Sequence, residues 1–221
     1  MDFPAPRPAD LVDVESLNQA FLGCLRSTPA GAALRHKLPA QQRTTLRQLS
    51  DVQIKRLAGA PFLLLSLREY DTVYWQRLLT AEPGRDLFTP APAARDPIVP
   101  IVTAALGYLW QLASRNPYNA RIVSGAPLQL CEQLSASPLV TLLQRAADRT
   151  DMLELRRASD HTFWNRLLGP CLSSNADIRR AAHLCALQTV LADTDVRTYT
   201  KIRTAARSAN TPTLKLPARH D

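Results

Sequence analysis

The sequence predicts an all-α protein of two tandem, related multi-helix units joined by a Pro-rich linker. The helix formers Ala, Leu, Arg and Gln dominate its 221 residues, whereas the alternating Val, Ile and Thr of strands are scarce. An internal repeat is the second observation: DTVYWQRLL at residues 71–79 returns as DHTFWNRLL at residues 160–168, with five identical positions. Such self-similarity indicates a duplicated unit, which we expect to form a pseudo-dimer within one chain.

Both copies of the repeated segment have the pattern of a helix that begins after a capping Asp, at Asp71 and at Asp160. Apolar residues follow three, four, seven and eight positions later, which places them on one helical face. The two tryptophans could instead be a ligand-stacking pair, but at this spacing core packing is the favoured interpretation. The predicted core anchors of the repeat are Tyr74, Trp75, Leu78, Phe163, Trp164 and Leu167.

The first unit is predicted to cover residues 13–80, after a Pro-rich lead-in at residues 1–12 that we expect to be disordered. A first helix should begin near Asp13 and end at the break in residues 27–31. Held without a gap, the register of the repeat also aligns Arg56 with Arg145 and Arg68 with Arg157. The later elements are predicted as helices near 40–48 and 51–58, an apolar segment at 62–67, and the Asp-capped helix.

Five prolines mark residues 81–100 as a semi-rigid linker. The second unit should cover residues 101–170 and end at the helix stop Gly169-Pro170. C-terminal helices are predicted over 171–207, with an amphipathic face at 177–191, and a disordered basic tail over 208–221. Within the second unit we expect helices at 101–114, 128–134, 139–147 and 152–157.

Positive charge is concentrated in two parts of the chain. The net charge of +8 comes from 23 Arg and 4 Lys against 19 acids, and residues 16–50 contain no acid at all. Such blocks attract nucleic acid, anionic membranes or acidic proteins, although a solubilising surface in an Arg-favouring genome gives the same composition. Charge alone supplies non-specific phosphate attraction. The electrostatic candidates for DNA contact are Arg35, Lys37, Arg43, Arg47, Arg197, Lys201, Arg203 and Arg207.

The residues with reactive side chains form no catalytic or metal-binding pattern. His183 and Cys185, with Cys171 upstream, come nearest to a metal cluster, but two residues apart on a helix they point in different directions. The glycines are isolated, so no phosphate loop is predicted, and no paired carboxylates stand out. We therefore expect no enzyme, no metal and no cofactor.

Compartment is predicted from the cysteines and from the absence of targeting signals. No CxxC pair occurs among the four cysteines, which fits reduced thiols in a cytoplasmic protein. The N-terminus lacks an apolar core of signal-peptide length, and no run reaches the roughly 20 apolar residues of a membrane span. A cytoplasmic location without membrane association is the expectation.

Four short segments carry a resemblance to a known family: LNQAFL at 17–22, TTLRQLS at 44–50, QIKRLA at 53–58 and LLLSLR at 63–68. In these segments the chain resembles the FlhD family of flagellar transcriptional activator subunits. The resemblance implies an all-helical dimer that activates transcription together with a zinc-containing partner subunit. Family chains hold a single unit, and the cysteine of their dimer contact is replaced here by an apolar residue near Leu64 and Leu65.

The sequence thus predicts a non-enzymatic regulatory protein that resembles an FlhD-type transcription regulator and acts through protein partners, DNA or both. The alternative is an all-helical adaptor or scaffold with two similar docking faces and no nucleic-acid role. The two interpretations differ in whether the basic segments bind DNA in a salt-dependent way.

Overall fold

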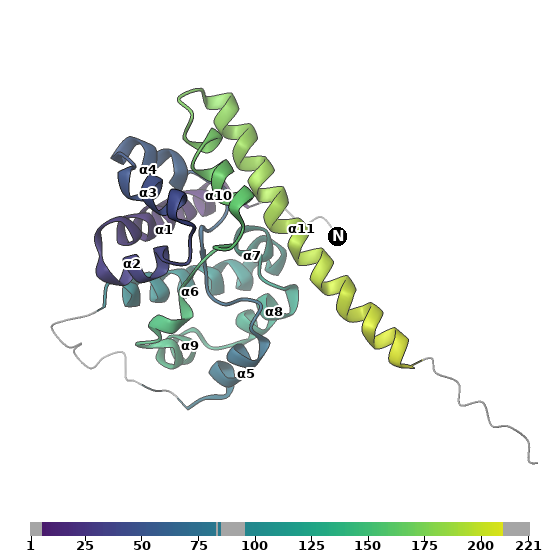
Figure 1. The fold of residues 1–221 in the computed structure, drawn as a ribbon. Helices are drawn as coiled ribbons and strands as arrows, with labels where there is room; N and C mark the ends of the chain where they lie inside the picture. The colour runs from purple at the N-terminus through teal and green to yellow at the C-terminus, as the bar shows by residue number, and fades with distance from the viewer. Residues whose placement is uncertain (1–5, 83, 85–95, 210–221) are drawn as a thin grey trace, which may run out of the picture.

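A computed structural model describes residues 6–82, 84 and 96–209 of the chain, and for residues 193–209 it describes the backbone only. Eleven α-helices and one two-stranded sheet occur in these residues (Figure 1). The predicted mostly helical fold is therefore confirmed. Residues 1–5 and 85–95, which belong to the predicted lead-in and linker, and residues 210–221 of the predicted tail lie outside the described part.

The same order of elements occurs twice along the chain: four helices, a short strand and a fifth helix. The first series is α1 (Pro8–Ser27), α2 (Pro29–Arg35), α3 (Ala40–Gln48), α4 (Asp51–Ala58), β1 (Leu65–Ser66) and α5 (Thr72–Thr80). The second series is α6 (Ile98–Arg115), α7 (Pro117–Ser124), α8 (Leu128–Ala136), α9 (Leu139–Ala146), the 3₁₀ turn η1 (Thr150–Met152), β2 (Glu154–Leu155) and α10 (His161–Leu167). A second 3₁₀ turn, η2 (Pro170–Leu172), then leads into the long helix α11 (Ala176–Ala209).

Three predicted boundaries need correction. Helix α1 begins at Pro8, inside the predicted disordered lead-in, because proline suits a first helical position and the Asp10 carboxylate accepts the Arg7 N–H at 2.9 Å. Helix α6 begins at Ile98, within the predicted linker. Helix α11 continues to Ala209, two residues past the predicted end of the C-terminal helices at 207.

Residues 62–67 and 152–157 hold the strands, so the helix predicted at 152–157 was wrong. β1 and β2 pair antiparallel, with Leu65 opposite Leu155 and Ser66 opposite Glu154. Buried Asn18 of α1 holds the approach to β1: its side-chain amide donates to Phe62 O at 2.9 Å, and its Oδ1 accepts from Leu64 N at 2.8 Å. Tertiary hydrogen bonds therefore override the local apolar pattern.

The core is continuous across both series of helices. α1 packs on α2, α4 and α6, and α6 packs on α7, α8 and α9. Tyr108 of α6 donates its hydroxyl to Asp10 O at 2.9 Å, which ties the two long helices together. α11 contacts α10 and η2, buries Ala186 and Val190, and then runs away from the helical body (Figure 1).

Candidate functional site

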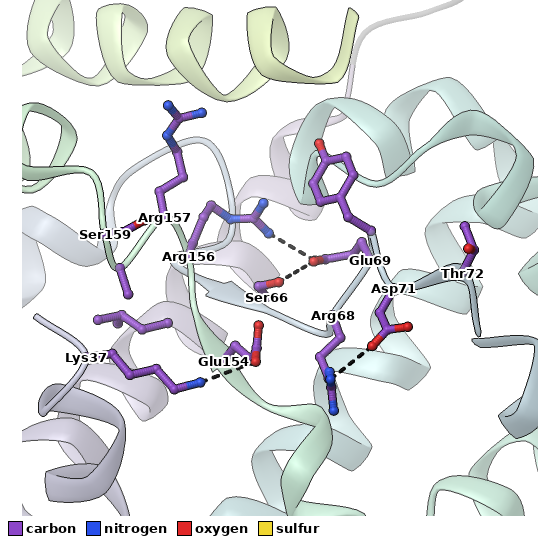
Figure 2. Close-up of a pocket in the computed structure, with 13 residues that line it drawn as sticks. Lys37, Ser66, Arg68, Glu69, Asp71, Thr72, Glu154, Arg156, Arg157 and Ser159 are labelled. Atoms are coloured by element: carbon purple, nitrogen blue, oxygen red, sulfur yellow. Dashed lines mark hydrogen bonds and ion pairs between the residues drawn. The ribbon is translucent and has the colours of Figure 1, made fainter. Parts of the chain in front are cut away.

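A polar hollow of about 770 Å³ lies over the two-stranded sheet. Figure 2 shows that its side chains come from the turn after β1, from β2 and the turn that follows it, and from Lys37, which precedes α3. The paired strands thus bring together two segments that lie far apart in the sequence. Volume and polarity make this hollow the first place to look for binding or chemistry.

A buried ion pair forms the base of the hollow. Arg156 Nη2 lies 3.2 Å from Glu69 Oε1 and donates to Leu65 O at 2.7 Å, while the Ser66 hydroxyl donates to the other oxygen of Glu69 (Figure 2). Arg156 and Glu69 are both almost completely buried. Because a buried charge needs a partner and hydrogen bonds, this arrangement fixes the two strands to each other.

The other cations of the hollow are also neutralised. Lys37 Nζ lies 3.2 Å from Glu154 Oε1, and Arg68 Nη2 lies 2.9 Å from Asp71 Oδ2 (Figure 2). Arg157 contacts Asp160 Oδ2, just outside the hollow, at 2.6 Å. The four cations that line the hollow thus each face a carboxylate, so it offers little positive charge to an anionic ligand.

The turns after the two strands have the same geometry. Arg68 and Arg157 both adopt a left-handed backbone, with φ of 56° and 49°. In each turn the arginine pairs with the Asp three residues later, and that Asp accepts a backbone N–H of the next helix at 2.9 Å. Both guanidinium groups also lie over an aromatic ring, at 4.7 Å from the centroid in the first turn and 5.7 Å in the second. The repeat seen in the sequence is therefore also a repeat of local structure.

The two tryptophans of the repeat point into the core rather than into a ligand site. Trp75 and Trp164 are buried, and their indole N–H groups donate to Arg68 O at 3.2 Å and Arg156 O at 3.0 Å. Each indole thereby holds the turn that precedes its helix. Of the other predicted anchors, Leu78, Phe163 and Leu167 are buried and Tyr74 is half-buried.

The basic candidates at 35–47 do not form one surface. Arg35 is buried at the end of α2, and desolvation, with the charge of Arg47 second, lowers its pKa. Lys37 belongs to the neutralised hollow, and Arg43 Nη1 donates to His36 Nδ1 at 2.8 Å. Arg47 is exposed. We therefore drop Arg35 as a phosphate contact, because its guanidinium lies inside the fold.

The remaining basic candidates lie on α11. Arg197, Lys201, Arg203 and Arg207 are on the part of the helix for which the backbone alone is described. At 3.6 residues per turn, 197 and 201 lie one turn apart, as do 203 and 207. This end of α11 is the part that leads away from the body (Figure 1).

No group of three or more His, Cys, Asp or Glu that could hold a metal occurs within the described ranges. No described helix has the length and apolar character needed to cross a bilayer. Burial raises the pKa of the Cys131 and Cys171 thiols to about 12, so both are protonated at neutral pH and are poor nucleophiles.

A second depression, of about 550 Å³, was not predicted from the sequence. This depression, the α4–α11 groove, lies between α4 and the start of α11. The spacing on each helix was visible in the sequence, but nothing there indicated that the two faces meet. The residues lining the groove are Glu15, Val52, Lys55, Arg56, Gly59, Pro61, Ala176, Arg179, Arg180, His183 and Leu184.

Comparisons of the chain with protein-family models, with curated proteins and with solved structures found no match.

Proposed function

We propose that this chain is a non-enzymatic regulatory protein, resembling an FlhD-type transcription regulator, whose two related units form a pseudo-dimer. It acts by binding a protein partner, and the basic end of α11 contributes DNA contacts. The repeated arginine turn beside the two-stranded sheet is the observation that carries the pseudo-dimer. The neutralised hollow and the protonated buried thiols favour a binding protein over an enzyme.

The register of the sheet supports a two-fold relation between the units. A shift of 89 positions takes Leu65 to Glu154 and Ser66 to Leu155. Leu65 pairs with Leu155. When each of these two residues is replaced by its counterpart in the repeat, the result is Glu154 paired with Ser66, which is the other observed pair. A two-fold axis requires this reciprocity, in which residue i contacts j and the counterpart of j contacts the counterpart of i.

Reciprocal packing of the terminal segments supports the same proposal. α5 of the first series packs on α9 of the second, and Arg145 Nη1 donates to Leu79 O at 2.5 Å. η2, which follows the second series, packs on α4 of the first, and Arg56 Nη1 donates to Leu172 O at 3.1 Å. Arg56 and Arg145 are counterparts in the repeat, and each donates to a backbone carbonyl near the end of the other series. The two acceptors are not themselves counterparts, because a shift of 89 positions takes Leu79 to Leu168.

Exposed apolar residues on the outer helices favour a protein-binding role. Val52 and Val140 are 61% and 51% exposed, and each is the second residue of its helix, α4 or α9. Each of these two helices therefore presents one exposed apolar side chain to a partner, although the two positions differ by one residue in the register of the repeat. This observation also favours the alternative of an adaptor with two similar docking faces.

A test of DNA binding by the end of α11 distinguishes the transcription regulator from the adaptor, which has no nucleic-acid role. A Lys201→Gln/Arg203→Gln/Arg207→Gln variant and a matched control of exposed arginines outside the DNA-contact candidates, Arg7→Gln/Arg77→Gln/Arg149→Gln, remove the same amount of charge. Binding to mixed duplex DNA, measured by fluorescence anisotropy at low and moderate salt, should weaken in the first variant and persist in the control. The slope of log affinity against log salt should fall by roughly 0.9 for each phosphate that the variant no longer neutralises.

If the wild-type chain does not bind DNA at low salt, the regulatory role through DNA is wrong and the adaptor alternative stands. Equal weakening in both variants would mean that the net charge, rather than α11, drives the binding.

A further inference from the structure

The α4–α11 groove differs from the polar hollow in its charge. Lys55 and Arg180 are exposed, and neither has an ion pair or a side-chain hydrogen bond within the described residues. Arg56 and Arg179 each direct Nη1 to a backbone carbonyl, Leu172 O at 3.1 Å and Ser173 O at 2.8 Å, and so remain charged without a carboxylate. Glu15 is the one acid in the lining. The groove therefore carries a net positive charge that the fold leaves uncompensated.

Each side of the groove is one face of a helix. α4 contributes positions 52, 55 and 56, with Gly59 directly after its end, and α11 contributes positions 176, 179, 180, 183 and 184. Both sets follow the three- and four-residue spacing of a single helical stripe. The groove lies between these two stripes, and its volume of about 550 Å³ falls within the roughly 300–1,000 Å³ of ligand-binding clefts.

The groove also has apolar walls on both sides. Val52 on α4 is 61% exposed and Leu184 on α11 is 51% exposed. Pro61, which follows α4, also lines the groove. A purely phosphate-binding surface does not need such side chains. An amphipathic helix does, because it buries an apolar face while its flanking carboxylates reach the cations.

His183 adds an independent indication of a ligand. Its side chain lines the groove and is only 7% exposed, and its Nε2 atom has no hydrogen-bond partner in the described part of the chain. Buried polar atoms are nearly always hydrogen-bonded in native proteins. This unpartnered imidazole nitrogen lies in a groove of uncompensated cations, where it can donate a hydrogen bond to an oxygen of an acidic ligand.

We infer that the α4–α11 groove binds an acidic amphipathic helical segment of a partner protein. This inference rests on the proposed partner-binding function and assigns it a site. The apolar residues of the segment would contact Val52, Pro61 and Leu184, and its carboxylates would pair with Lys55 and Arg180. Nucleic acid fits less well because the apolar walls would remain uncovered.

The second series of helices offers no copy of this groove. Lys55 has Gln144 as its counterpart 89 positions later, Gly59 has Asp148, and Glu15 has Ala104. α11 follows the second series and has no counterpart after the first among the described elements. The chain therefore takes one acidic segment, and the stoichiometry of binding is 1:1.

Peptide selection tests the inference without a known partner. A display library of random peptides of about 15 residues, long enough to form a helix, is selected for binding to the immobilised full-length chain. The selected peptides should be rich in Asp and Glu, with apolar residues three or four positions apart. A synthesised selected peptide should bind 1:1 in calorimetry. Its affinity should fall by about tenfold or more in Lys55→Glu/Arg180→Glu, where like charges repel, and in Leu184→Asp, where a carboxylate replaces an apolar wall.

An Arg77→Glu/Arg149→Glu control makes the same change in net charge on exposed residues outside the groove and should keep the affinity within about twofold, a change below roughly 0.5 kcal/mol. Circular dichroism and thermal unfolding establish that each variant is folded. Equal weakening in the two double variants would assign the binding to bulk charge and overturn the inference, as would peptides without an acidic excess or a failure to enrich any.

Two further outcomes separate this inference from the proposed function. Peptides that bind the groove variants as well as the wild type would overturn the groove but leave the partner-binding function standing. Duplex DNA that binds more weakly to Lys55→Glu/Arg180→Glu, but not to the control, would assign the groove to nucleic acid and overturn the inference.

Discussion

Arg68 and Arg157 hold the same left-handed backbone conformation 89 positions apart, and each pairs with the aspartate three residues further on. A non-glycine residue in this conformation costs roughly 1–2 kcal/mol. The ion pair, the aromatic ring beneath each guanidinium and the capped helix that follows offset this cost. Two arginines in the same rare conformation therefore mark a structural motif that the chain uses twice.

Asp71 and Asp160, the aspartates of this motif, should contribute similar amounts to the free energy of unfolding. Asp71→Ala and Asp160→Ala each remove a helix cap, worth roughly 0.5–2 kcal/mol, and an ion pair with the preceding arginine. Urea unfolding should show that both variants are less stable than the wild type by about 1–2 kcal/mol. A Thr80→Ala control at the exposed end of α5 should stay close to wild type. A variant as stable as the wild type would mean that its turn does not depend on the cap.

The Arg156–Glu69 pair should show strong coupling in a double-mutant cycle. Removing either partner alone leaves a buried charge, which typically costs 3–5 kcal/mol. Arg156→Met should be the more harmful change, because Arg156 also donates to Leu63 O and Leu65 O. In Arg156→Met/Glu69→Gln no unpaired charge remains, so the measured destabilisation should be clearly smaller than the sum of the two single effects. Additive effects would contradict a direct interaction.

Stability should fall with acidification because of His183. Burial, and then the charge of Arg179, lowers the pKa of His183 to about 4. The unfolded chain takes up this proton near pH 6.5, whereas the folded chain takes it up only near pH 4, so stability decreases as the pH falls between these values. This one titration should lower the free energy of unfolding by about 1.5 kcal/mol between about pH 6.5 and about pH 5.

His183→Gln removes this titration, so its stability should change less with pH over that window in urea unfolding. His161→Gln, a substitution of an exposed histidine on α10, is the control and should keep the wild-type dependence. An unchanged pH dependence in His183→Gln would contradict burial of the neutral imidazole.

A chain cut between the two series of helices should not separate. A protease site introduced within residues 85–95 yields two pieces that still share the paired strands, the α5–α9 contact and the α4–η2 contact. Size-exclusion chromatography after cleavage should give one peak with the mass of the whole chain. Two separate folded monomers would contradict the proposed pseudo-dimer.

Elements that depend on local pattern were predicted well from the sequence. The α5 and α10 helices follow from a capping Asp and the apolar spacing after it, and both begin directly after that residue. The helices near 40–48 and 51–58 agree closely with α3 and α4. Each of these features is set by residues within a few positions of one another.

Features that depend on distant partners were not predicted. β1 and β2 have two residues each, too short for a strand pattern, and they form because each completes the hydrogen bonds of the other. Nothing local signals a left-handed backbone at Arg68, where glycine is the usual residue. The burial of Arg35 and the α4–α11 groove likewise depend on how the helices pack.

The sheet shows what joining two units in one chain makes possible. Under the proposed pseudo-dimer, a symmetric pair of identical short chains would have to place the same two side chains in both pairs of this sheet. Here one pair is Leu65 with Leu155 and the other is Ser66 with Glu154. A covalently joined pair can therefore be apolar on one side of its pseudo-two-fold axis and polar on the other. A single mutation then changes one side without altering the symmetry-related position.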